Sequence, residues 1–287
     1  MSRQRAQFAR CSTCAFTFAA SLLLAAPVSA QSRNNQRSGA ANDNRGDEFN
    51  WSGSIASGNS IIIRNINGPI RVERSNSSRV EVSAEKHWRR GNPADVRIEQ
   101  PRSTSGDVVI CALWSKESTC DAEGIHTPRN VRGSNNNRDN DVSVHFVVRV
   151  PNGVRVDIET VNGGFEIEGG DNQILANTVN GSIEAHGASG PVRARTVNGS
   201  ITIAMNSLRT SEDLDYETVN GSVTLEMPSN FGAQLDLSTV NGRVNTDFPV
   251  TVVGTLSMRK LRGTVGSGSA RVHATTVNGS ISLVRSN

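Results

Sequence analysis

The sequence predicts an all-β protein built as a parallel β-solenoid, and three observations lead to this prediction. The tripeptide Val-Asn-Gly occurs six times between residues 161 and 279, each time directly after Thr. Apolar and polar residues alternate on both sides of the copies, which is the pattern of a half-buried strand. The 287-residue chain is 36% hydrophobic with 26 glycines. This composition allows a packed core.

The first segment, residues 1–30, has the three parts of a secretory signal peptide. Arg3, Arg5 and Arg10 form a basic start, residues 11–26 are mainly apolar, and 28–30 (Val-Ser-Ala) provide small residues for cleavage. Export to the periplasm, the cell surface or the medium is therefore expected. No later apolar run approaches the ~18 residues of a membrane-spanning helix, so we expect no membrane span in the mature chain.

Export also changes the charge of the protein. Cleavage removes three of the 30 Lys and Arg residues and none of the 27 Asp and Glu residues, so the mature counts become equal. Binding to nucleic acid depends on an excess of basic groups. We therefore expect no nucleic-acid partner.

The mature chain divides into three regions. Residues 31–47 are polar and lack aromatic and β-branched residues, which is typical of a disordered linker. Residues 48–150 contain short β-like runs and a polar insertion at 121–141. In this region, 61–64 and 70–73 are predicted strands on either side of Asn67-Gly68.

Two cysteines, Cys111 and Cys120, remain after removal of Cys11 and Cys14 with the signal peptide. A pair of cysteines in an exported protein most simply forms a disulfide. A metal or redox site would need further Cys or His ligands at suitable spacing, which the sequence lacks.

Residues 151–287 form the Val-Asn-Gly repeat region, which we expect to continue from 48–150 because Ile66-Asn67-Gly68 resembles a repeat. Successive repeat Asn residues are separated by 18, 18, 22, 21 and 37 positions. The last gap suggests a degenerate unit near 262–266. The predicted repeat-turn residues are Asn162, Gly163, Asn180, Gly181, Asn198, Gly199, Asn220, Gly221, Asn241, Gly242, Asn278 and Gly279.

Two architectures fit this pattern. In an antiparallel meander, each Asn-Gly is a hairpin turn. In a parallel solenoid, each unit of 18 to 22 residues is one coil, and equivalent residues stack about 4.8 Å apart. The solenoid is favoured because stacked Asn side chains can form hydrogen bonds from coil to coil, whereas a hairpin does not require the repeated Thr and Val.

The Thr-Val-Asn-Gly-Ser-Ile type repeats, the 49–51 and 66–68 segments, the Cys111/Cys120 pair and the closing residues 276–283 resemble the bacterial putative-adhesin family of β-strand-repeat proteins. The resemblance covers roughly residues 48–287. It implies an exported, repeat-built protein of the cell envelope. The family has unknown function and no agreed catalytic residues, so the resemblance assigns no chemistry to individual residues.

A search for catalytic chemistry finds little. Glu166 and Glu184 are one repeat apart and form a candidate acid-base pair, but the next equivalents are Thr202 and Thr224. No histidine pair has metal-ligand spacing, and no Gly-x-Ser-x-Gly motif is present. We therefore predict no catalytic residue, no metal site and no cofactor.

The sequence favours a non-enzymatic structural or adhesive interaction module, whose ligand-binding residues remain open. Its partner would be an envelope or host glycan or a protein, bound on the elongated polar face of the solenoid. One alternative is an enzyme that acts on polysaccharide. A further alternative is an envelope sensor or scaffold that pairs through its terminal strand, because the chain stops soon after Leu283. The oligomeric state is left open.

Overall fold

The computed structural model consists mainly of β-strands. It describes residues 44–103, 105–128, 140–207, 213–252, 257–268 and 270–286. The expected signal peptide (1–30), residues 31–43 of the expected linker and residues 129–139 of the expected insertion lie outside the described residues. Within the described part, no helix is long and apolar enough to cross a membrane.

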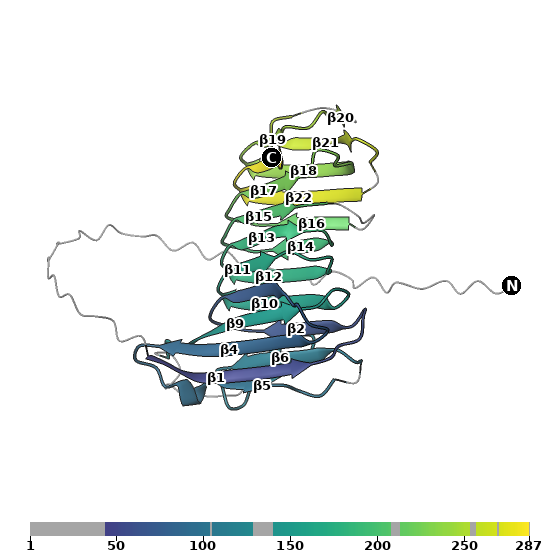
Figure 1. Cartoon of the computed structure of the whole chain (residues 1–287). Coiled ribbons are helices and arrows are strands. Elements are labelled where there is room, and N and C mark those ends of the chain that lie inside the picture. The colour runs from purple at the N-terminus through teal and green to yellow at the C-terminus, as the bar shows by residue number, and fades with distance from the viewer. Residues whose placement is uncertain are drawn as a thin grey trace, which may run out of the picture. The chain divides into compact units, whose positions relative to one another are not determined.

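Almost all strands belong to two large sheets, which we call sheets A and B (Figure 1). Sheet A has the spatial order β1 (Asn44–Gly53), β4 (Val80–Trp88), β9 (Ser143–Val150), β3 (Ile70–Arg74), β11 (Phe165–Glu168), β13 (Ile183–Ala188), β15 (Ile201–Met205), β17 (Val223–Met227), β23 (Ile281–Arg285) and β19 (Val244–Thr246). Sheet B has the order β20 (Thr251–Val252), β21 (Lys260–Val265), β18 (Ala233–Asn241), β22 (Ala270–Asn278), β16 (Asp213–Glu217), β14 (Val192–Arg195), β12 (Ile174–Asn180), β10 (Arg155–Asn162), β2 (Ser60–Arg64), β6 (Val108–Leu113) and β5 (Arg97–Glu99). A short hairpin of β7 (Thr119–Cys120) and β8 (Ile125–His126) and one 3-10 turn, η1 (Pro93–Asp95), complete the described elements.

Each repeat is one coil that contributes a strand to sheet B and then a strand to sheet A. For example, β10 leads through its Val-Asn-Gly corner into β11, and the next coil stacks on it in parallel register, with Val156 opposite Ile174 and Phe165 opposite Ile183. The predicted parallel solenoid is therefore confirmed.

The alternative meander with Asn-Gly hairpins is wrong for a physical reason. Two-residue hairpins of the Asn-Gly type need positive φ angles in the turn. None of the six repeat glycines has a positive φ, and no non-glycine residue in the described part of the chain has one. The repeat corners turn the chain from one sheet into the other. Gly68 has a positive φ of 122°, but Asn67-Gly68 also joins strands of different sheets, β2 in sheet B and β3 in sheet A.

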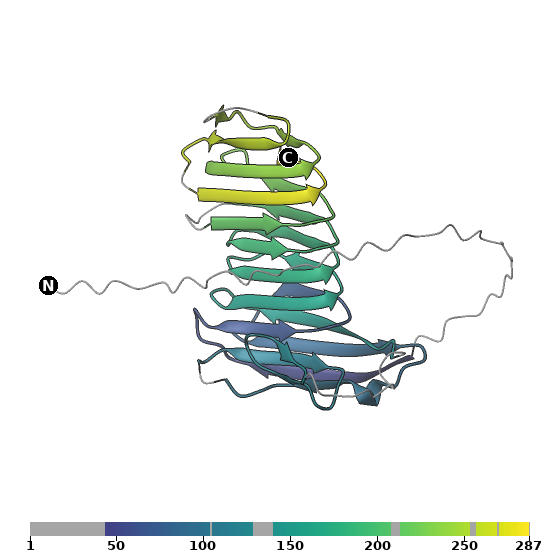
Figure 2. The ribbon, with the colours of Figure 1, turned by 180° about the vertical axis from the view of Figure 1, so that it is seen from behind.

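The order of the coils in space differs from their order in sequence. The last coil, β22 and β23, lies between the β16–β17 coil and the β18–β19 coil. Figures 1 and 2 show the yellow strand β22 between green strands. The expected open terminal strand is therefore wrong, because β23 pairs with β17 on one side and β19 on the other.

The 37-residue gap before the last repeat does not hold a degenerate coil. Residues 262–266, where we expected one, lie mostly in β21, which pairs antiparallel with β18 and with the two-residue strand β20. These antiparallel strands cover the edge that β18 would otherwise expose. Covering an edge strand in this way blocks further strand addition.

The core lies between the two sheets. Residues that alternate inward along each strand are buried, for example Ile158 on β10 and Ile167 on β11, both with 0% exposure. Burial of one such aliphatic side chain contributes about 1.5–3 kcal/mol. The inward residues of all coils form one continuous apolar cluster.

At the other end of the stack, the N-terminal strands close the solenoid. Strand β4 pairs antiparallel with β1 on one side and with β9 on the other, and β9 itself pairs in parallel with β3. The first of these strands starts at Asn44, so residues 44–47 of the expected linker belong to β1.

A disulfide joins Cys111 on β6 to Cys120 on β7, with 6.5 Å between the Cα atoms. It lies in a second small apolar cluster on the outer side of sheet B, where Ile62 and Leu113 are covered by residues around Ile125. The bridge therefore holds the β7–β8 hairpin over sheet B.

Candidate functional site

The repeat corners form a continuous ladder of asparagine side chains. In five neighbouring pairs, the side-chain Nδ2 of one Asn donates to Oδ1 of the Asn on the adjacent coil, at 2.7 to 2.9 Å. In spatial order the ladder is Asn162, Asn180, Asn198, Asn220, Asn278 and Asn241. Because the side-chain amides form hydrogen bonds with one another, the main role of the ladder is to hold neighbouring coils together.

The Thr and Gly of the repeat also join neighbouring coils. The Thr178 hydroxyl donates to the carbonyl oxygen of Gly163 at 2.9 Å, and the other five repeat Thr residues make the same kind of bond. A Cβ atom at Gly199 would lie 2.0 Å from the carbonyl oxygen of Gly181. Only glycine permits this approach.

The Val of each repeat points outward. Five of the six are 38–40% exposed, and Val240 reaches 55%. They form an exposed apolar row that runs from coil to coil beside the Asn ladder. Val is repeated at this position although it does not face the core, because β-branched residues favour extended backbone.

The outer side of sheet A carries an open groove of about 430 Å³. It crosses four neighbouring strands, β9, β3, β11 and β13, and begins near the repeat corners at Gly164 and Ser182. The charged residues in its lining are Arg71, Glu166 and Glu184, and His145 is the neighbouring imidazole. Neighbouring strands are about 4.8 Å apart, so the groove follows the direction in which coils are added.

The structure brings Glu166 and Glu184 together, as their spacing of one repeat predicts. They are direct partners in the parallel pair of β11 and β13. Arg71 from β3 donates to Glu166 at 2.5 Å and also lies 3.6 Å from Glu168. Glu166 is therefore an ion-paired carboxylate. The residues that follow at the same position in the stack, Thr202 and Thr224, do not continue an acidic row.

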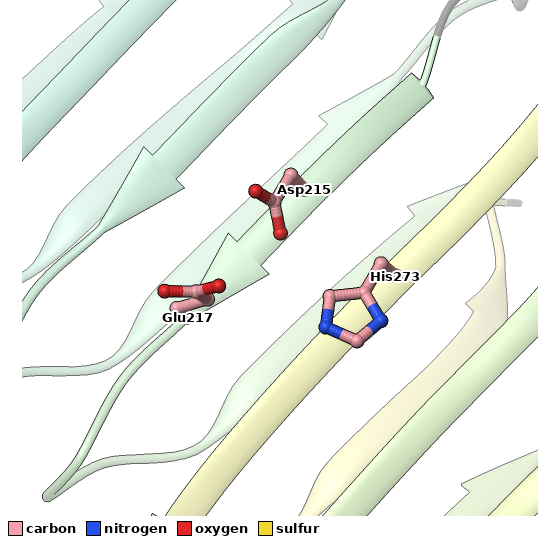
Figure 3. A group of neighbouring side chains, drawn as sticks. All are labelled: Asp215, Glu217 and His273. Atoms are coloured by element: carbon pink, nitrogen blue, oxygen red, sulfur yellow. The ribbon is translucent and has the colours of Figure 1, made fainter. Parts of the chain in front are cut away.

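The outer side of sheet B carries a second group of chemically active side chains, shown in Figure 3. Asp215 and Glu217 lie on β16, two positions apart and therefore on the same face, and His273 lies on β22 directly opposite Asp215. One ligand atom from each residue lies within 4.8 Å of the others. All three side chains are half-buried. Two carboxylates and an imidazole are suitable ligands for a divalent transition metal.

Arg195 on β14 borders this group. Its guanidinium donates to Asp215 Oδ2 at 2.5 Å and lies 3.5 Å from Glu217 Oε2. Burial lowers the pKa of Arg195, but the hydrogen bond to Asp215 and the charges of Glu217 and Asp215 outweigh this effect and raise the pKa above its usual value. Arg195 is therefore a permanent cation that orients both carboxylates.

Asp236 on β18 lies on the other side of His273. It accepts two hydrogen bonds from Arg262, from Nε at 3.0 Å and from Nη2 at 2.8 Å. These bonds hold the pKa of Asp236 below its usual value. Asp236 is thus already paired, and it lines a neighbouring open pocket of about 440 Å³ with Arg262 and Arg271.

The sequence did not reveal the Asp215, Glu217 and His273 group. The alternation along β16 indicates that the two acids share a face, but His273 is 58 and 56 positions away from them. The group forms only because β22 lies next to β16. If the coils followed sequence order, β18 would be the neighbour and Asp236 would be opposite Asp215, since both pair with His273 in the same register.

A family model described as Toastrack DUF4097 matches residues 70–284. The comparison with curated proteins gives no match. Several solved structures match the chain at low sequence identity.

A putative cell adhesion protein from Clostridium sporogenes is 9% identical, with a TM-score of 0.41, over 84% of this chain and 99% of that chain. A putative adhesin from Bacteroides fragilis is 9% identical, with a TM-score of 0.37, over 82% and 96% of the two chains. A putative lipid binding protein from Parabacteroides distasonis is 12% identical, with a TM-score of 0.27, over 84% and 98%.

Proposed function

The chain belongs to the Toastrack DUF4097 family, and we propose that it is an exported, non-catalytic interaction module of the cell envelope that binds an extended glycan. The observation that carries this proposal is the groove on the outer side of sheet A. It is open to solvent and crosses several coils, so it suits a polymer better than a small enclosed molecule.

The lining of the groove suits a sugar polymer. Arg71 supplies hydrogen-bond donors, and Glu184 supplies acceptors for sugar hydroxyls. Gly164 lies at the corner end of the groove and presents no side chain that would narrow it. Because the groove lies on strands of a packed solenoid, these side chains are held on a rigid surface. Such preorganisation lowers the entropic cost of binding.

The experiment is a retention assay with the purified protein and a panel of bacterial and host polysaccharides. We expect at least one polysaccharide to be retained without any change in its mass. The variants Arg71→Ala and Glu184→Gln should each weaken retention by about tenfold or more. Arg262→Ala is the matched control, since Arg262 is also an exposed, ion-paired arginine but lies on sheet B. Equal weakening by all three variants, or no retention of any glycan, would contradict the proposal.

A second candidate function, cleavage of polysaccharide, is favoured by one observation: Glu166 and Glu184 are direct neighbours in the same groove. Glycosidases that retain configuration hold two carboxyl groups about 5–5.5 Å apart, and parallel strands have a similar spacing. Against this function, Arg71 forms an ion pair with Glu166. The mass measurement in the same assay separates the two functions, because shortened chains that disappear with Glu166→Gln would establish the enzyme and overturn the non-catalytic proposal.

The proposed location outside the cytoplasm rests on the features of residues 1–30 and on the disulfide. Disulfides persist in oxidising compartments. N-terminal sequencing of the protein recovered from the periplasm, the cell surface and the medium should give Gln31 as the first residue. Recovery of only the uncleaved chain from the cytoplasm would contradict export.

A further inference from the structure

We propose that Asp215, Glu217 and His273 form a binding site for a divalent transition metal, with Zn²⁺ as the best-suited ion. This site lies on sheet B, away from the groove on sheet A, and it does not depend on the proposed glycan binding. Two features of the site, besides the identity of its residues, support it.

The first feature is an oxygen atom without a partner. Asp215 Oδ2 is held by Arg195, but Oδ1 is shielded from solvent and has no hydrogen-bond partner among the described residues. A buried polar atom without a hydrogen-bond partner destabilises the folded state. A bound cation would satisfy this oxygen without displacing Arg195.

The second feature is the imidazole of His273. Within the parts of the chain that the structure describes, neither ring nitrogen takes part in a hydrogen bond, and the ring interacts with Asp236 only through charge. The ring lies in register with Asp215 on one side and Asp236 on the other. Asp236 is engaged by Arg262 through both oxygens, so the acids of β16 are the ones left to share an ion with His273.

The three residues lie near enough to one another for a single ion to contact all of them after a small movement. The three ligand atoms lie within 4.8 Å of one another, while tetrahedral bonds of about 2.1 Å place ligand atoms roughly 3.4 Å apart. Rotation of the His273 side chain, which lies on the same outer face as the two carboxylates (Figure 3), would shorten its distances to them. Arg195 fixes the orientation of both carboxylates, as groups that contact metal ligands commonly do.

The mixed ligand set determines the kind of ion. Imidazole nitrogen with carboxylate oxygens suits Zn²⁺, whereas Ca²⁺ and Mg²⁺ prefer oxygen ligands alone. Three protein ligands leave at least one coordination position open. On an exposed face, that position is available to water or to an acidic group of a bound partner.

The test is titration calorimetry of the purified protein, without a histidine tag, with ZnCl₂ in a buffer that does not bind zinc. We expect one Zn²⁺ per chain and at least tenfold weaker binding of Mg²⁺. The variants His273→Gln and Glu217→Gln should each weaken zinc binding by about tenfold or more. The matched control is His186→Gln, which removes an exposed histidine from sheet A and should leave zinc binding unchanged.

Circular dichroism will show that the variants are folded, and NMR of the histidine rings provides a readout that needs no variant on the site. Zn²⁺ should shift the His273 ring signals of the wild type at a molar ratio of one. The proposal is overturned if the wild type shows no zinc binding at millimolar concentration, if the His273 signals do not move, or if His186→Gln weakens binding as much as His273→Gln does.

Discussion

The side chain of Asn278 donates a hydrogen bond to Asn220 at 2.7 Å, although 58 positions separate the two residues. Asn241, which lies between them in the sequence, donates to Asn278 from the other side at 2.9 Å. The hydrogen bonds of the Asn ladder therefore follow the order of the coils in space, which differs from their order in the sequence. The final coil is inserted between two earlier ones, and this insertion also places His273 beside Asp215.

The insertion of the last coil predicts which backbone amide hydrogens exchange slowly with solvent. Strand β23 is internal in sheet A, and β19 is the edge strand. The backbone amides of residues 281–285 should exchange as slowly as those of 223–227, and the amides of 244–246 should exchange at least tenfold faster. Exchange mass spectrometry of the native protein will measure this. Fast exchange at 281–285 with slow exchange at 244–246 would show that the coils follow sequence order.

The ladder contributes to stability. Asn198 donates to Asn180 and accepts from Asn220, so Asn198→Ala removes two hydrogen bonds between side chains. At about 0.5–1.5 kcal/mol for each bond, the free energy of unfolding should fall by about 1–2 kcal/mol in urea titrations. Val197→Thr, a change of similar volume at the exposed neighbouring position, is the control and should stay within about 0.5 kcal/mol. Equal losses in the two variants would mean that the ladder bonds contribute nothing specific.

The close approach of the corner glycines predicts a larger loss of stability than the loss expected for Asn198→Ala. In Gly199→Ala, the added methyl group would lie 2.0 Å from the Gly181 carbonyl oxygen, which belongs to backbone that cannot move alone. The two coils must separate, and we expect a loss of about 3 kcal/mol, measured by thermal and urea unfolding. Gly170→Ala is the control, because the nearest atom there is 3.2 Å away on the side chain of Asn172. A Gly199→Ala protein as stable as the Gly170→Ala protein would contradict the packing described above.

The disulfide should stabilise one end of the molecule. It closes a loop of nine positions, for which the loss of chain entropy in the unfolded state corresponds to about 2.5 kcal/mol. In the double variant Cys111→Ala, Cys120→Ala, the free energy of unfolding should fall by about that amount. Treatment with reductant should lower the free energy of unfolding of the wild type to that of the variant. Proteolysis should then begin near the β7–β8 hairpin and spare the coils from β10 to β17. If reductant has no effect on the wild type, the bond does not form in the protein.

The ion pair of Asp236 with Arg262 predicts a dependence of stability on pH. Since these hydrogen bonds lower the pKa of Asp236 from 3.8 in the folded state, the pair stabilises the protein above about pH 4. This contribution is lost as the pH falls below 3.8 and through the lower pKa of the folded state. The stability difference between the wild type and Asp236→Asn should therefore shrink between pH 6 and pH 3, as followed by urea midpoints. A constant difference over this range would show that the carboxylate charge plays no part.

Several features of the fold were predictable from particular residues. Alternation around each repeat identified inward residues such as Ile158 and Ile167, both of which are buried. The repeated Thr-Val-Asn-Gly pointed to stacked coils, because only stacking uses Thr and Asn at every copy. The structure joins Cys111 and Cys120, the pair for which the sequence predicted a disulfide.

Other features were not predictable. The gap of 37 residues before the last repeat has nearly the length of two coils, which suggested an additional coil. It contains instead the strands β20 and β21, and β21 runs back antiparallel along β18. Arg71 and Glu166 are 95 positions apart. Their contact follows from the neighbouring positions of β3 and β11, which the periodicity of the sequence does not specify.

The repeat pattern is enough to identify the residues that face the core, the positions where the chain turns and the side chains that can form hydrogen bonds from one coil to the next. These properties depend on local periodicity and on the chemistry of single residues. The order of the coils in space is visible only in the folded chain. That order creates the groove on sheet A and the Asp215, Glu217 and His273 group on sheet B. The physical reason is that every repeat corner offers the same hydrogen bonds to any other repeat corner. The choice of neighbour therefore depends on the whole chain, including strands β20 and β21, which cover the edge of sheet B at β18.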